Sequence, residues 1–262
     1  MVQNIRLGMH APAADRKMVF PSGHHLFGTT IAPDSVLRTG INPNPRMFAN
    51  DRLSDCTSAS TYNGARAIYK LVTQDSNIDL VVNDDNVIQF YSDCTGYNPN
   101  DPSTDTGANI DHVMKTALLR GIPTQTERLF PLVAEFDISD VEAIRNGLNM
   151  FGALHLGVGL AIADQNTNRV WDTNTPGDQT QGSWGWHDLN LWEYAGKNDT
   201  DIVTLLTWGG EQKATWRWVK ARAGIAAAMA FHQLVTPVMK TVNGVLWDTF
   251  VAENHNLLQT VA

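Results

Sequence analysis

A cysteine placed directly before a helix-like run is the feature that most constrains how this chain can fold. Cys56 follows the polar stretch 50–55, and the run from Ser58 to Val72 carries apolar residues among polar ones, as a helix packed on one side would. A thiol attacks as its thiolate, and the unpaired N–H groups at a helix start stabilise that negative charge. The pattern predicts a nucleophile at a helix start, with a buried structural cysteine as the alternative.

A nucleophilic cysteine needs a general base that is its neighbour in space rather than in sequence. His187 is the candidate, because a loop rich in Gly and Trp leads into it and an alternating segment follows to Tyr194. A turn at 196–199 then leads into a second apolar segment, 202–210, that ends in two glycines. These signals predict a β-hairpin that carries His187.

Taken in order, these features resemble the papain-like cysteine peptidases, in the wide sense that includes divergent bacterial and phage-encoded members. Asn50 lies six residues before the cysteine, where the family has Gln, and Cys56 opens a long helix. His187 begins a strand, and the pair Trp208-Gly209 closes the next one. Each motif is weak alone, whereas the ordered set is moderately specific.

Two further segments extend the resemblance over roughly residues 46–220. The stretch 104–123 is similar to the segment that links the two lobes of the family, and 140–158 is similar to its helix-then-strand passage. The resemblance implies an α+β fold with a helical lobe headed by Cys56 and a β lobe that carries His187. The expected parts are an N-terminal arm (1–45), a papain-like domain (46–220) with strands near 153–162, 187–194 and 202–208, and a C-terminal extension (221–262), helical by its pattern.

The resemblance implies thiol-dependent acyl transfer, most simply peptide or isopeptide hydrolysis. Cys56 would attack the carbonyl carbon, and His187 would take the thiol proton and later protonate the leaving amine. Asn50 and the backbone N–H of Cys56 would hold the oxyanion. Trp208 would shield the histidine, and Trp208 and Trp186 are the candidates for substrate contact, although aromatic residues at strand spacing more often belong to the core.

Three departures from the family pattern bear on activity. The family usually has an Asn that orients the imidazole, and the aligned residue here is Leu206, so another orienter is needed: Thr207, a backbone carbonyl or water. Asp55 directly precedes the cysteine, where its charge would raise the pKa of the thiol unless it caps the helix instead. Asn50 is one methylene shorter than Gln.

These departures leave open a second function, a catalytically inactive papain-like protein that serves as a structural or binding component, for example of a phage particle. Arm-like extensions at both ends suit contacts with other subunits of an assembly. The partners expected are therefore a peptide or protein substrate, or other subunits.

Composition narrows the remaining choices. The chain has 262 residues, 43% hydrophobic, with a formal net charge of −8 and a pI near 5.4. Neither a nucleic acid nor a membrane is expected as a partner, because both would select clustered Lys and Arg. No signal-peptide pattern and no long apolar run occur, so synthesis as a soluble cytoplasmic protein is expected.

The other candidate residues carry little chemistry. Cys94 is expected to be a passive thiol in a loop, with a single disulfide left open. The pair His24-His25 lacks further ligands at suitable spacing, so no metal and no cofactor are expected. Asp188 should point to the opposite face of its strand from His187 and is not expected to orient it.

Overall fold

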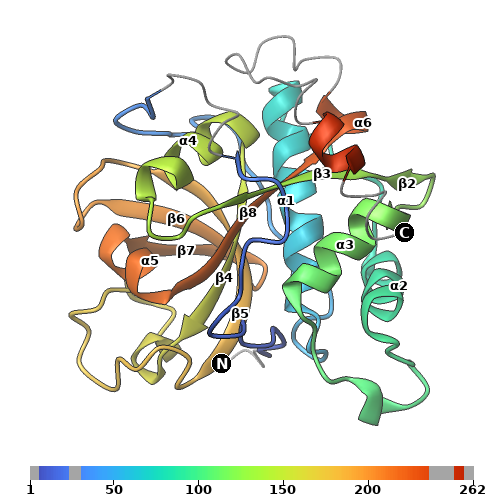
Figure 1. Cartoon of the computed structure of the whole chain (residues 1–262), viewed down its shortest axis with the longest axis horizontal. Coiled ribbons are helices and arrows are strands. Elements are labelled where there is room, and N and C mark those ends of the chain that lie inside the picture. Colours follow the sequence, from blue (N-terminus) through green and yellow to red (C-terminus); the bar gives the residue numbers. More distant parts are fainter. Residues whose placement is uncertain (1–5, 24–30, 236–250, 257–262) are drawn as a thin grey trace.

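The computed structural model of the protein describes residues 6–23, 31–235 and 251–256. Figure 1 shows two halves side by side, one built of helices and the other of a curled β-sheet. The helical half contains α1 (Cys56–Thr73), α2 (Asp84–Thr95), α3 (Ile110–Arg120) and the two-stranded pairing of β1 (Ile122–Pro123) with β2 (Arg128–Leu129). The α+β, two-lobe architecture expected from the sequence is confirmed.

Local sequence signals explain where the helices begin and end. Asn83 caps α2 by accepting a hydrogen bond from the Asn86 backbone N–H, and Gly96 ends the helix in the left-handed conformation. Asn109 caps α3 in a similar way. Helix α1 differs, because Asp55 occupies its N-cap position without making a side-chain capping bond. The capping role considered for Asp55 is therefore wrong.

The β lobe is one antiparallel sheet of six strands in the order β3-β8-β4-β5-β6-β7. The hairpin of β5 and β6 is the one expected to carry His187, and it is confirmed. Helices α4 and α5 accompany the sheet (Figure 1). The bounds are β3 (Pro131–Phe136), α4 (Val141–Phe151), β4 (Leu154–Leu160), β5 (Gly185–Tyr194), β6 (Ile202–Thr207), β7 (Gly210–Thr215), α5 (Trp216–Arg222), β8 (Ala223–Phe231) and α6 (His232–Val235).

The expected helical extension beginning at 221 is wrong over its first part. Residues 223–231 form β8, which lies inside the sheet between β3 and β4. Alanine favours helices in isolation, but both faces of this strand are covered, and burial of a continuous apolar run outweighs that propensity. The β lobe thus continues past the expected boundary at 220. Residues 236–250 and 257–262 of the expected helical extension lie outside the described residues.

The N-terminal segments lie against the body of the protein. In Figure 1 the blue segment runs between the helical half and the sheet. Arg16 ties it to both halves, with hydrogen bonds to Asp111 on α3 (2.8 Å from Nε) and to the buried Glu135 on β3. Farther along, the backbones of Val36 and Tyr194 exchange hydrogen bonds of 2.9 and 3.1 Å.

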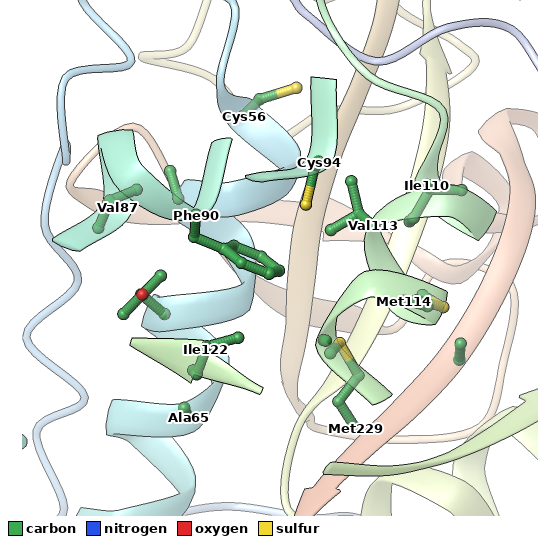
Figure 2. Close-up of a cluster of buried hydrophobic side chains, with 14 of the residues drawn as sticks. Cys56, Ala65, Val87, Phe90, Cys94, Ile110, Val113, Met114, Ile122 and Met229 are labelled. Atoms are coloured by element: carbon green, nitrogen blue, oxygen red, sulfur yellow. The ribbon is translucent and has the colours of Figure 1, made fainter. Parts of the chain in front are cut away.

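The core has two parts. One lies among α1, α2 and α3 and receives alternate side chains of β8, and the other fills the curled sheet. Figure 2 shows the first part: the Cys94 sulfur points into it beside Val113, whereas Cys56 lies at its edge with the sulfur directed away from Phe90. Cys94 lies on α2 rather than in the expected loop, and both thiols are free and buried. No helix among the described residues has the length and apolarity needed to cross a membrane.

Candidate active site

The thiol of Cys56 lies at the junction of the two halves. Helix α1 packs against β5, so its first residue meets the beginning of the strand that carries His187. Cys56 is 1% exposed, and the backbone N–H groups of Asp188 and Gly8 approach its sulfur. Burial raises the pKa of the Cys56 thiol to about 12, and these two amides offset part of the rise. The thiol is therefore protonated in this state.

The imidazole of His187 is held by two consecutive residues at the end of β6. Its Nε2 atom lies 2.7 Å from Oγ1 of Thr207, and its ring stacks on Trp208 with centroids 4.3 Å apart and planes 23° apart. Thr207 was one of the three orienters considered in place of Leu206, and it occupies that role. Leu206 itself is buried apolar surface. Trp208 covers the ring as expected.

The other nitrogen of His187 is free to take a proton. Among the described residues, Nδ1 has no hydrogen-bond partner. A threonine hydroxyl that accepts from Nε2–H leaves Nδ1 as an unprotonated acceptor. Burial lowers the pKa of His187 to about 3, so the ring is neutral.

Cys56 and His187 line one small cavity, of about 10 Å³, which is room for roughly one water molecule. Asn50, Asp188, Thr207 and Trp208 line it as well. The structure thus brings together the predicted nucleophile, the predicted base and the predicted oxyanion donor. A larger hollow of about 380 Å³ lies alongside, and Trp208 and Met47 line both.

Asn50 and Asp55 interact beside the thiol. The Asn50 amide donates to the Leu53 carbonyl oxygen at 3.1 Å, and it also faces the Asp55 carboxyl. Asp55 is fully buried, and burial raises its pKa well above the ordinary range, an effect that Asn50 partly offsets. Burial thus favours the uncharged form of Asp55, which weakens the effect of its charge on the Cys56 thiol that the sequence suggested.

The N-terminal segment 6–10 covers the thiol. Its backbone joins both halves: Met9 N–H donates to the Trp186 carbonyl at 3.3 Å, and Ala108 N–H donates to the Gly8 carbonyl at 2.7 Å. Trp208 also donates from Nε1 to the Arg6 carbonyl at 3.4 Å. A Cβ added at Gly8 would meet the Ser54 carbonyl oxygen at 1.9 Å, so the segment is in close contact with the start of α1. Residues 6–10 have no periodic pattern, so their position over the thiol cannot be predicted from the sequence.

A second buried histidine lies close to the same helix. His155 on β4 places Nδ1 3.0 Å from Oδ2 of Asp188 and 3.3 Å from Oγ of Ser60, one turn after Cys56 on α1. All three side chains are buried. As expected from strand alternation, Asp188 does not orient His187. His155 was not among the predicted site residues, because a single histidine in an apolar strand gives no signal of a partner on another strand.

The remaining candidates lie apart from the cavity. Trp186 does not line it, and its backbone carbonyl accepts the hydrogen bond from Met9 of the covering segment. His24 and His25 lie outside the described residues. Within those residues, no cluster of three His, Cys, Asp or Glu side chains is arranged to hold a metal ion. Of the seven tryptophans in the described residues, four are fully buried in the core: Trp171, Trp192, Trp216 and Trp218.

A curled antiparallel sheet that faces a cysteine-bearing helix defines the papain-like fold, and solved structures agree. Xylellain, a cysteine protease from Xylella fastidiosa, superposes with a TM-score of 0.61 at 12% identity, over 88% of this chain and 98% of that one. Digestive procathepsin L 3 of Tenebrio molitor larval midgut gives 0.57 at 12% identity, over 88% and 77% of the two chains. A procathepsin B from Trypanosoma congolense gives 0.59 at 9% identity, over 86% of each.

No model of a known protein family matches the sequence, and no curated protein sequence matches it either. The likeness to solved structures is therefore one of fold, and the chain has a divergent papain-like fold. The phage-particle role considered from the sequence has no support among the three structures named above.

Proposed function

We propose that this protein is a thiol-dependent acyl transferase of the papain-like kind, most simply a peptide or isopeptide hydrolase. The observation that carries the proposal is the shared cavity of Cys56 and His187, with Nε2 of His187 held by Thr207 at 2.7 Å and Nδ1 left open. A nucleophile, a base and an orienter of that base are the parts that this chemistry requires.

In the proposed reaction, the Cys56 thiol gives its proton to Nδ1 of His187 while the sulfur bonds to the carbonyl carbon of the scissile amide. The oxyanion is held by the backbone N–H of Cys56 and by Asn50, whose amide turns from Leu53 to reach it. The C–N bond breaks as His187 returns the proton to the leaving amine. Water, with His187 as base, then hydrolyses the thioester and frees Cys56.

His187 is a better candidate for the base than His155. His155 does not line the cavity, and its Nδ1 is already engaged by Asp188 and Ser60. His187 lines the cavity with Cys56 and offers an uncommitted nitrogen.

The described state is a closed form of this site. Segment 6–10 lies over the sulfur, and the thiol and the imidazole are both held neutral by burial. Substrate therefore enters only when the segment moves. Hydration of the opened site would reverse the main cause of both pKa shifts, so thiolate and imidazolium would form together. The open hollow beside Trp208 provides room for one side of a bound peptide.

The alternative is a papain-like protein without catalysis. It is favoured by the same burial, and by the replacement of the family's orienting amide by a threonine hydroxyl, which stabilises an imidazolium less well. In that case segment 6–10 would be a permanent part of the core. Assembly through surfaces of the chain would then be its function.

Peptide cleavage would be measured with a pooled peptide library and detection of new termini by mass spectrometry. The proposal expects cleavage by the parent chain that is abolished by Cys56→Ala and by His187→Ala, and retained by His112→Ala, since His112 is exposed and distant from the cavity. Cleavage that survives Cys56→Ala, or no cleavage even in a variant whose segment 6–10 is displaced, would overturn it.

A further inference from the structure

The pair formed by His155 and Asp188 lies directly behind the thiol and is unused by the reaction proposed above. Asp188 follows His187 on β5, and its backbone N–H approaches the Cys56 sulfur while its side chain extends toward β4 and α1. There Oδ2 meets His155 at 3.0 Å, and Oδ1 has no hydrogen-bond partner among the described residues. Asp188 and Ser60 both line the cavity that holds Cys56 and His187.

Burying a carboxyl and an imidazole carries a desolvation penalty, which apolar residues at the same interface would not have. Farther along β5, beyond the buried Asn190, Trp192 packs into the helical core beside α1 and shows that an apolar side chain can fill this interface. Asp188 and His155 instead place a proton that can move between them beside the Cys56 thiol, which must become a thiolate during the proposed reaction.

We propose that His155 and Asp188 form a buried acid–base pair that sets the charge beside Cys56, with His155 as a positioning residue that holds and neutralises the Asp188 carboxyl. The inference rests on the proposed function only in taking Cys56 as the working thiol. In this proposal the pair starts as the His155 imidazolium and the Asp188 carboxylate. When Cys56 loses its proton to His187, the proton on His155 Nδ1 moves to Asp188: one N–H bond breaks and one O–H bond forms, which leaves a neutral imidazole and a neutral carboxyl. The negative charge on the carboxylate is thereby removed as negative charge develops on sulfur.

The groups that face the pair are few. Ser60 of α1 contacts the pair, and the charge of Asp188 acts on the Cys56 thiol, as does that of Asp55. An ionised Asp188 raises the pKa of Cys56, and so does Asp55 if ionised. Burial raises the pKa of Asp188 itself, and His155 and Ser60 offset part of that rise. Of the two side chains that contact Asp188, His155 thus favours the charged form of the carboxyl more strongly.

The two members of the pair should affect the thiol in opposite directions. Asp188→Asn keeps the shape and removes the carboxylate, so the Cys56 thiolate becomes easier to form. His155→Gln keeps a hydrogen-bonding side chain but removes the proton donor, so any charge on Asp188 stays uncompensated. A purely structural pair predicts the same sign for both, namely a looser fold.

The experiment measures iodoacetamide alkylation of Cys56 and Cys94 in the same full-length molecule, by mass spectrometry, from pH 6 to pH 9. Cys94 is buried in the helical core, so its rate reports general opening of the fold, and the Cys56 to Cys94 rate ratio removes that contribution. At pH 7 we expect Asp188→Asn to raise the ratio about tenfold, equivalent to about one pKa unit, and His155→Gln to lower it by a similar factor. The double variant should return close to the parent value.

Asp164→Asn is the matched control, because Asp164 is equally buried and pairs with Arg222 at 2.8 Å without lining the cavity. It should leave the ratio unchanged. If His155→Gln does not fold, the test rests on Asp188→Asn alone, which should raise the Cys56 to Cys94 rate ratio. A ratio that Asp188→Asn leaves unchanged or lowers, or that both variants shift in the same direction, would overturn the inference. The proposed function fails separately, on peptide cleavage, which this ratio does not measure.

Discussion

Nε2 of His187 lies 2.7 Å from Oγ1 of Thr207, one residue beyond the leucine that aligns with the orienting amide of papain-like peptidases. The hydroxyl reaches the ring from the end of β6, directly before Trp208 stacks on the same imidazole. One short stretch of chain therefore orients the histidine and shields it.

Thr207→Val tests this orientation. Valine has the same shape but cannot accept from Nε2–H, so a buried donor is left without its partner at a cost of about 1–3 kcal/mol. The lost hydrogen bond should raise the free energy of the transition state by a similar amount, so we expect kcat/KM to fall roughly tenfold or more. Thr207→Ser keeps the hydroxyl and should retain most of the activity. Equal losses in both variants would mean that packing, not the hydrogen bond, matters at this position.

Displacing segment 6–10 should expose the thiol. Gly8→Ala adds a Cβ that would lie 1.9 Å from the Ser54 carbonyl oxygen, and backbone cannot yield as a flexible side chain can. The rate of Cys56 alkylation, divided by that of Cys94, should rise roughly tenfold, on the basis of about 1–3 kcal/mol of overpacking. Gly210→Ala is the control, since an added Cβ there meets nothing closer than 4.0 Å. An unchanged ratio would show that the segment does not limit access to Cys56.

The sequence predicted the parts of the fold that have local signals. Helix α1 was expected from its one-sided apolar pattern, and the β5–β6 hairpin from its turn at 196–199. The prediction of a helix at β8 was wrong. The alanine content of this segment favours a helix, but the segment pairs with β3 on one side and β4 on the other and therefore forms a strand. Sheet partners are long-range contacts, and nothing within 223–231 reveals them.

The site was predictable to a similar degree. Cys56, His187 and Asn50 do line one cavity, and Thr207 was among the possible orienters. The cover by segment 6–10 and the partner of Asp188 were not predictable, because each depends on which strands and segments meet in space. The environment of Asp55 also required the structure, since only burial decides whether that carboxyl is charged.

Asp55 should make stability depend on pH. Its pKa is raised in the folded protein above the ordinary value of 3.8, so its contribution is fully present below that value and is lost as pH rises toward the folded pKa. Asp55→Asn removes this loss, and the free energy of unfolding of the variant relative to the parent should increase by about 1.4 kcal/mol per pH unit over that window. Urea unfolding at pH 4, 6 and 8 measures this, with the half-exposed Asp51→Asn as control. If the free energies of unfolding of Asp55→Asn and of the parent differ by the same amount at all three pH values, the raised pKa of Asp55 is contradicted.

His187 should have the opposite dependence. Burial lowers its pKa from 6.5 to about 3, so its contribution to stability is present above pH 6.5 and is lost as pH falls toward 3. His187→Gln should therefore reduce the acid sensitivity of the fold, by about 1.4 kcal/mol per pH unit in that range. Unfolding midpoints at pH 4, 5.5 and 7 test this, with the exposed His112→Gln as control. An unchanged slope would mean that His187 is already hydrated in the resting protein.

The central claim is that Cys56 and His187 work as a nucleophile and its base. The most direct measurement is labelling of the Gly8→Ala protein with a peptidyl acyloxymethyl ketone, followed by mass spectrometry of the modified peptide, with and without His187→Gln. The account predicts modification at Cys56 and not at Cys94, and its loss when His187 is replaced. Alkylation of Cys56 by iodoacetamide without any reaction with the peptidyl reagent, or labelling unaffected by the loss of His187, would contradict it.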